Sequence, residues 1–190
     1  MILVVDSSAL VLLVNPAASP PDDPATKSPV EHAKARVEHL IASLGISDTI
    51  VIPTPVLAEV LVRAGEGAAG VLEAINGMAR IKVRSYDVRA AVETAQMTLA
   101  DIQAGDKKGG SGESWQKIKF DRQIIAIARV EGAELIYADD KGLTAFAKRL
   151  GMSVVSTWDL SVPESATNLF TAVGLEPGGH LKDDGNELSK

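Results

Sequence analysis

Four carboxylates interrupt or end apolar segments of this chain, where an unpaired charge would be costly. Asp6 follows an apolar run at the start of the chain, and Asp139 follows a second one near its end. Glu59 and Asp121 each interrupt an apolar segment between those two runs. A charge in such surroundings must be paired, neutralised or bound to a cation. If the four converge, they form a set of hard oxygen ligands that suits Mg²⁺ or Mn²⁺ rather than zinc or copper.

A divalent cation held in this way could bind a phosphodiester and activate water for its hydrolysis. Sites that use two ions hold them about 3.5–4 Å apart. Such chemistry needs no histidine, and the three histidines of the chain, His32, His39 and His180, lie outside any motif. Their placement disfavours a histidine-based ribonuclease and a Ser-His-Asp hydrolase.

Each carboxylate also has a purely structural interpretation. Aspartates after strands often cap helices or close turns, which would account for the two that follow apolar runs. Glu59 has Arg63 four residues later, and Asp121 has Lys117 four residues earlier, so both could form ion pairs along a helix. The metal-site hypothesis is favoured because four such carboxylates occur together in one folding pattern.

Strand and helix patterns alternate along the chain, which predicts an α/β fold with a parallel sheet. The expected strands cover residues 2–5, 50–52, 81–84, 134–138 and 153–156. The expected helices begin near residues 29, 54, 71, 87, 117 and 142. The first of these has Ser28 as a cap and Pro29 in its first turn. The helix that begins near residue 87 has an apolar side made of Val88, Ala91, Val92, Ala95, Leu99 and Ile102.

These elements can bring the carboxylates together. Ligands of open parallel sheets bind beyond the carboxyl ends of the strands, where the strand order reverses. Asp6 and Asp139 follow the first and fourth strands, so they meet if those strands are neighbours. Glu59 is three residues from both Val56 and Val62. Asp121 is three, four or seven residues from the apolar side chains expected to share its buried face: Ile118, Ile124, Ile125 and Ala128.

Composition sets the outer limits. The chain has 190 residues, a net charge of −6 and no cysteine. This length suits one domain that buries roughly 70% of its unfolded surface, and thiolate chemistry and cysteine-based zinc sites are excluded. The start of the chain lacks the basic region of a signal peptide, and no apolar run reaches the ~18–20 residues of a membrane span. We therefore expect a cytoplasmic protein.

The negative net charge, taken alone, argues against nucleic-acid binding. A basic cluster nevertheless lies before and around Asp121, and it could contact an RNA backbone: Lys107, Lys108, Lys117, Lys119 and Arg122. An ordinary solvated surface is the alternative interpretation of these side chains.

A competing motif lies at Gly65–Gly70, which matches the G-x-G-x-x-G pattern of dinucleotide-binding folds. That function requires a strand directly before the first glycine. Thr54-Pro55 predicts a helix there instead, so a helix–helix connection is the favoured interpretation of the glycines.

The four carboxylates lie in motifs that occur in a fixed order: VVDSSAL at 4–10, LAEV at 57–60, FDRQIIAIA at 120–128 and LIYADD at 135–140. Over roughly residues 1–160, this order resembles the PIN-domain nucleases and, within them, the VapC-type ribonuclease toxins. The resemblance implies a three-layer α/β/α fold with a five-stranded parallel sheet. It also implies RNA cleavage that depends on Mg²⁺ or Mn²⁺, with Asp6, Glu59, Asp121 and Asp139 as catalytic metal ligands and Ser8 as a supporting residue.

The same resemblance implies a homodimer and an antitoxin partner. A PIN-like module that has lost activity and only binds RNA or protein is the alternative, although all four acidic positions are filled. Tyr137 departs from the family, which often has threonine two residues before the last aspartate. Asp140 and Asp159 are candidate auxiliary carboxylates. We expect a nuclease domain over 1–160 with a proline-rich insertion at about 15–29, and a partly disordered extension over 161–190.

Overall fold

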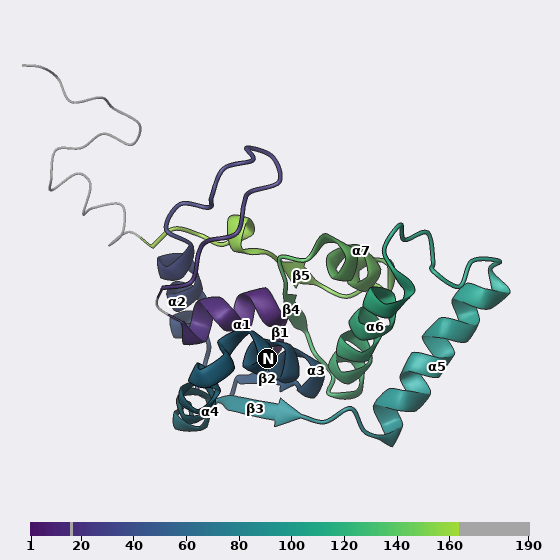
Figure 1. Cartoon of the computed structure of the whole chain (residues 1–190), viewed down its shortest axis with the longest axis horizontal. Helices are drawn as coiled ribbons and strands as arrows, with labels where there is room; N and C mark the ends of the chain where they lie inside the picture. Colours follow the sequence, from purple (N-terminus) through teal and green to yellow (C-terminus); the bar gives the residue numbers. More distant parts are fainter. Residues whose placement is uncertain (16, 164–190) are drawn as a thin grey trace, which may run out of the picture.

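The chain folds around a five-stranded sheet flanked by helices, as the computed structural model shows for residues 1–15 and 17–163 (Figure 1). The strands are β1 (Ile2–Val5), β2 (Thr49–Pro53), β3 (Ile81–Arg84), β4 (Leu135–Tyr137) and β5 (Val154–Val155). The helices are α1 (Ser7–Val14), α2 (Ala33–Ser43), α3 (Thr54–Ala64), α4 (Ala68–Gly77), α5 (Val88–Gln103), α6 (Trp115–Val130) and α7 (Lys141–Arg149). Short 3-10 turns cover Gly65–Gly67 and Thr157–Asp159.

The sheet is parallel throughout and has the strand order β3-β2-β1-β4-β5. The order reverses at β1, which pairs with β2 on one side and β4 on the other. Val4 therefore lies between Val51 and Ile136. The predicted α/β architecture is confirmed, and the first and fourth strands are neighbours, which is the condition for Asp6 and Asp139 to meet.

The core lies at the centre of this sheet. Leu3, Val4 and Val5 are fully buried, as a central parallel strand with helices on both faces requires. Helix α6 buries a long apolar face that includes Ile124 and Ile125 against the same cluster. This packing fixes the direction in which α6 presents its polar residues.

One local prediction and one alternative need correction. Helix α2 begins at Ala33 rather than near Pro29, because Pro29 forms an antiparallel bridge with Asp22 and Val30 donates to the Pro21 carbonyl. These backbone bonds hold the proline-rich segment as a loop. Residues 59–63 belong to α3 and not to a strand, so the dinucleotide-binding interpretation of the glycines is wrong. The glycines form a 3-10 turn and the start of α4, as a helix–helix connection would.

The apolar side of α5, expected from the sequence, faces outward, with Val88 80% exposed and Leu99 53% exposed. The buried residues of α5, Ala90, Met97 and Asp101, belong to the other side of the helix, which packs on α6. In Figure 1, α5 accordingly lies at the periphery of the molecule, beside α6.

No helix in the described part of the chain combines the length and apolar character needed to span a bilayer. The expected extension falls almost wholly on residues 164–190, which lie outside the described residues.

Candidate metal and nuclease site

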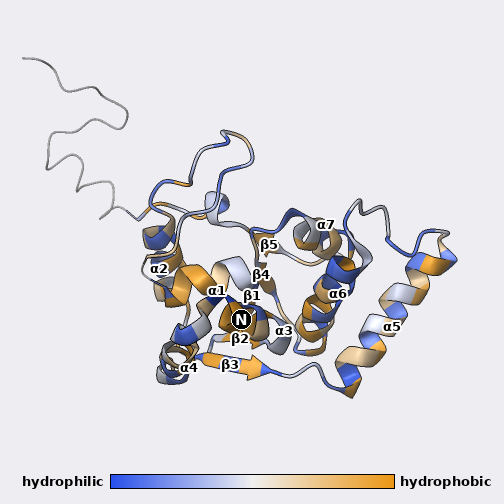
Figure 2. Ribbon diagram, in the orientation of Figure 1, coloured by the Kyte–Doolittle hydropathy of each residue, from blue (hydrophilic) through white to orange (hydrophobic). Residues whose placement is uncertain are grey.

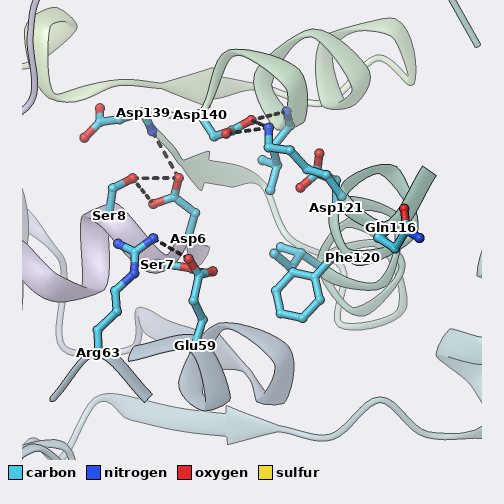
Figure 3. Close-up of a pocket in the computed structure, with 13 residues that line it drawn as sticks. Asp6, Ser7, Ser8, Glu59, Arg63, Gln116, Phe120, Asp121, Asp139 and Asp140 are labelled. Carbon is cyan, nitrogen blue, oxygen red and sulfur yellow. Dashed lines mark hydrogen bonds and ion pairs between the residues drawn. The ribbon is translucent and has the colours of Figure 1, made fainter. Parts of the chain in front are cut away.

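A cleft of about 720 Å³ opens where β1 and β4 end, bordered by the first turns of α1 and α7 and by α3 and α6. All four predicted carboxylates line it, and so does Asp140 (Figure 3). The polar lining is completed by Ser7, Ser8, Arg63, Gln116 and Lys117, and the apolar lining by Phe120, Ile124 and Leu143. The structure thus brings the predicted acidic residues to one cavity.

Asp6 is the most deeply buried of these carboxylates, at 3% exposure. It caps α1 by accepting from the Ala9 amide at 2.8 Å, and the Ser8 hydroxyl donates to its two oxygens at 2.9 and 3.0 Å. The Asp139 amide donates to Oδ2 at 3.1 Å, which joins the ends of β1 and β4. Burial raises the pKa of Asp6 to about 6 although these hydrogen bonds oppose it. Every donor to this carboxylate is electrically neutral, so a cation would stabilise its charged form.

Asp121 faces the same cleft from α6 and is 9% exposed, as helical periodicity predicted. Its carboxylate accepts no hydrogen bond from any described residue. Burial raises the pKa of Asp121 to about 7. The positive charge of Lys117 opposes this rise, whereas the negative charges of Asp140, Glu113 and Asp6 add to it. Asp121 is therefore a buried carboxylate whose negative charge is only partly compensated.

Lys117 pairs with Asp140 and not with Asp121, contrary to the ion pair considered from the sequence. Its Nζ donates to both Asp140 oxygens, at 3.0 and 2.8 Å. Burial alone would raise the pKa of Asp140, but these bonds and the Leu143 amide lower it. Gly142 leaves the room for this arrangement, since a Cβ there would lie 3.2 Å from Asp140 Oδ1 and 3.2 Å from Lys117 Nζ.

Asp139 reaches the cleft with its backbone, while its carboxylate points away from Asp6 (Figure 3). Thr157, after β5, donates to that carboxylate from its amide and its hydroxyl, each at 2.7 Å. The Tyr137 hydroxyl lies 2.6 Å from the Thr157 hydroxyl. Tyr137, the departure from the family pattern, thus contacts the aspartate through Thr157. Burial raises the pKa of Asp139 against these hydrogen bonds.

Glu59 is held by two neighbours. The Ser7 hydroxyl donates to one of its oxygens and the Arg63 guanidinium to the other. The ion pair with Arg63 is the structural interpretation that the sequence left open. The Glu59 side chain is 34% exposed. Val62, which was expected to share a buried face with Glu59, is 81% exposed. Glu59 therefore borders the cleft near the surface.

The basic cluster does not form one surface. Lys117 lines the cleft, Lys108 donates to the Glu113 carbonyl at 2.8 Å, and Lys107 lies 5.3 Å from the Trp115 ring. Lys119 is exposed on α6 outside the cleft lining. The prediction that Arg122 contacts RNA is wrong, because its side chain is only 1% exposed.

Arg122 instead joins α6 to α5. It donates to Asp101 at 2.5 Å, to Thr98 at 2.9 Å and to the Lys107 carbonyl at 2.7 Å. Arg149 of α7 donates to both oxygens of the same Asp101. A buried arginine needs such partners, and the interhelical network they form fixes the residue after Asp121.

The side chains as oriented here form no group of three histidine, aspartate or glutamate residues that could hold a metal ion within the described residues. The hydrogen bonds explain this, because Glu59, Asp139 and Asp140 are each engaged by a neighbour. Sequence reasoning had paired Glu59 with Arg63, but it missed Ser7 and Thr157 as neighbours of the carboxylates. The two serines after Asp6 gave a signal in the sequence, which was assigned to Ser8 alone.

Comparison with known structures supports the fold. The chain is similar to VapBC-1 from nontypeable Haemophilus influenzae, with a TM-score of 0.53 and 15% identity over 83% of this chain and 98% of that one. It is also similar to VapBC2 from Rickettsia felis bound to a promoter DNA fragment, with a TM-score of 0.52 and 13% identity over 82% and 98%. Mycobacterium tuberculosis VapC20, described as a sarcin-ricin loop cleaving toxin, gives a TM-score of 0.50 and 16% identity over 76% and 94%.

No protein-family model and no curated protein sequence matches the chain. The similarity to VapC structures is therefore one of fold, and at that level it confirms the resemblance seen in the order of the motifs.

Proposed function

We propose that this protein is a divalent-metal-dependent endoribonuclease that hydrolyses RNA phosphodiester bonds. One observation carries the proposal: Asp6 and Asp121, from two separate elements, are buried carboxylates that face one cleft, and no cationic side chain of residues 1–15 or 17–163 pairs directly with either. The VapC-like fold supports the same activity, and one protein of that fold is described as cleaving the sarcin-ricin loop.

The donor set fits Mg²⁺ or Mn²⁺. Carboxylate oxygens are the ligands that these hard cations prefer, and the raised pKa values of Asp6 and Asp121 mean that a cation would favour their charged forms. We assign these two as the principal ligands, with Glu59 and Asp139 completing the set. When bound, the ion would supply charge neutralisation for the phosphodiester and an acidified water.

The remaining groups of the cleft orient these ligands and bind the substrate. Ser8 fixes both oxygens of Asp6, and Thr157 fixes the carboxylate of Asp139, whose backbone amide donates to Asp6. Arg63 and Lys117, on opposite borders of the cleft, place positive charge where RNA phosphates would enter. Lys107, Lys108 and Lys119 stay a prediction as further RNA contacts; neutralising them together should flatten the salt dependence of RNA binding.

Cleavage of structured and single-stranded RNA with Mg²⁺, Mn²⁺ or chelator tests the proposal. We expect metal-dependent cleavage by the wild type and a loss of roughly 100-fold or more in Asp6→Asn and Asp121→Asn. Asp87→Asn is the matched control, because Asp87 caps α5 outside the cleft and asparagine caps equally well. Unchanged cleavage in both cleft variants would overturn the site assignment. RNA binding without cleavage by the wild type would favour the inactive-module alternative.

We further propose that the enzyme is the toxin of a toxin–antitoxin pair. Two of the proteins with this fold were solved as VapBC complexes, which supports a protein partner for this chain. A small gene adjacent to this one, whose product co-purifies with the chain and suppresses RNA cleavage, is the expected result. Growth that is unaffected by expression of the active chain alone would contradict the toxin role.

A further inference from the structure

A second cavity, of about 190 Å³, lies between α7 and the loop that joins α5 to α6. We call it the α7 slot; its walls include residues 108–111, Ile118, Ala145, Phe146 and Arg149. Asp121 lines both this slot and the cleft, so the two cavities meet at a proposed metal ligand. In Figure 2, apolar segments of α6 and α7 lie beside the loop, which is itself hydrophilic or neutral.

The loop side of the slot is held by its own hydrogen bonds. Asp106 accepts from the amides of Lys108 and Gly110, at 2.9 and 2.7 Å. Gly109 has a φ of 61°, and a Cβ at this position would overlap the Arg149 guanidinium. A side chain there would be strained and would push Arg149 aside, so glycine lets the loop close on α7. The slot is therefore preorganised by the conformation of the loop.

The slot has apolar walls with two cations beside them. Ile118 is buried, and the Phe146 ring is partly exposed, with the central carbon of the Arg149 guanidinium 5.0 Å from the ring centre. The Arg149 side chain is 42% exposed although it pairs with Asp101. Lys108 donates one hydrogen bond to a carbonyl of its own loop, and an ammonium has three donors. Both cations can therefore contact an anion while the apolar walls contact a ring.

These features fit one nucleobase. The volume is below the roughly 300–1,000 Å³ of pockets that enclose a drug-sized ligand, so the slot admits a base and not a whole nucleotide. Unpaired RNA bases stack on aromatic side chains and present polar edges, for which the Ser111 hydroxyl is a donor and an acceptor. The phosphate of the same nucleotide would stay outside, near Lys108 and Arg149. An aromatic side chain of a protein partner would fill the slot but give these two cations no anion.

The position of the slot relates it to the proposed site of cleavage. Gly142 lines the slot, and a Cβ there would lie 3.6 Å from Asp121 Oδ2. An RNA strand that brings a phosphodiester to Asp121 therefore has the slot within reach of a neighbouring base. We propose that the α7 slot binds one unpaired RNA base beside the cleaved phosphodiester and so selects the nucleotide at that position. This placement rests on the proposed nuclease function, whereas base binding itself does not.

Binding of single-stranded RNA to the full chain, measured in chelator, tests the slot separately from cleavage. Ala145→Trp fills the slot and should weaken binding roughly 10-fold, which is the contribution of one stacked base. Duplex RNA, whose bases are paired, should bind the wild type and this variant equally. Ala91→Trp is the matched control, because Ala91 is exposed on α5 and lines neither cavity. Phe146→Leu, which removes only the aromatic ring, should weaken single-strand binding as well, and circular dichroism should show all three variants folded.

Cleavage of a random single-stranded RNA pool with Mg²⁺ tests the placement of the base. The wild type should prefer one nucleotide beside the cleaved bond, and Ala145→Trp should lose this preference while Ala91→Trp keeps it.

The outcomes separate base binding, its placement and the nuclease function. Single-strand binding of unchanged strength in both Ala145→Trp and Phe146→Leu would overturn base binding. Cleavage with an unchanged nucleotide preference in Ala145→Trp would overturn the placement and leave the nuclease function intact. Slot-dependent binding without any cleavage would refute the nuclease function and the placement, but not base binding. If Ala145→Trp loses only the binding of a protein partner, the slot takes a protein side chain and the proposal is wrong.

Discussion

Replacing Asp121 with asparagine should make the metal-free protein more stable while it abolishes cleavage. The side chain is 9% exposed, and burial raises the pKa of Asp121 from 3.8 to about 7. Asparagine has nearly the same shape but no charge, so it removes the cost of a buried carboxylate. The substitution thus separates the stability of the site from its proposed chemistry.

The sign and size of this effect depend on pH. Because the pKa is raised in the folded state, the folded protein binds more protons than the unfolded one between pH 3.8 and about 7, and stability falls as pH rises through this window. A pKa change of one is worth about 1.4 kcal/mol of free energy. The rise in the pKa of Asp121 from 3.8 to about 7 therefore corresponds to roughly 4 kcal/mol. Because the cleft is open to solvent, screening reduces this free energy. We expect Asp121→Asn to gain about 2–4 kcal/mol near pH 8 and roughly 2 kcal/mol less near pH 5.

Urea unfolding followed by circular dichroism, at both pH values and in chelator, measures this gain. Asp140→Asn is the control of opposite sign, because hydrogen bonds from Lys117 outweigh burial and lower the pKa of Asp140. That variant should lose stability. Mg²⁺ should stabilise the wild type by about 2.7 kcal/mol at a hundred times its Kd, and Asp121→Asn far less. A variant less stable than the wild type at pH 8, or a gain independent of pH, would refute the reasoning.

Three further predictions concern the groups around the carboxylates. Ser8→Ala removes the hydroxyl that donates to both Asp6 oxygens and helps to lower the pKa of Asp6. The affinity for Mn²⁺, measured by calorimetry, should therefore fall several-fold below pH 7. An affinity equal to that of the wild type would count against this role. Asp101→Asn leaves Arg122 and Arg149 without their shared carboxylate and should cost about 3–5 kcal/mol in urea unfolding, whereas Asp106→Asn in the neighbouring loop should cost much less. Gly142→Ala places a Cβ 3.2 Å from both Asp140 Oδ1 and Lys117 Nζ. RNA cleavage should therefore drop while the melting temperature changes little. Unchanged cleavage would show that the Lys117–Asp140 pair has no part in the site.

Apolar runs and helical periodicity predicted most of the elements that position the site, but not helix α1, which Asp6 caps. The positions of Asp6 and Asp139 at strand ends follow from the apolar runs before them, and the burial of Asp121 follows from its spacing to Ile124 and Ile125; the adjacency of the two strands was only a condition of the hypothesis. These features are local or topological, so a single sequence contains them. The helix at Thr54 was also predicted, because a proline in the first turn is a local signal.

The orientation of the side chains could not be predicted in the same way. Glu59 and Asp139 line the cleft, but Arg63 and Thr157 hold their carboxylates. Thr157 reaches Asp139 only because β5 pairs with β4, and periodicity carries no information about such a contact. Arg122 was wrongly predicted to bind RNA for a related reason. A charged residue is expected to be exposed unless it has a buried partner, and the partner of Arg122 is Asp101, which comes from a helix distant in the sequence.

The position of Arg122 connects the candidate site to the arrangement of α5, whose apolar side faces outward. Asp121 and Arg122 are consecutive residues of α6, and one faces the cleft while the other enters the α5 contact. A buried arginine must be satisfied, so the inward side of α5 has to present Thr98 and Asp101. Apart from Ala90 and Met97, which are buried, the larger apolar residues of α5 lie on the outside. Because the same network fixes the helix that carries Asp121, disrupting Asp101 should weaken cation binding as well as the stability of the fold.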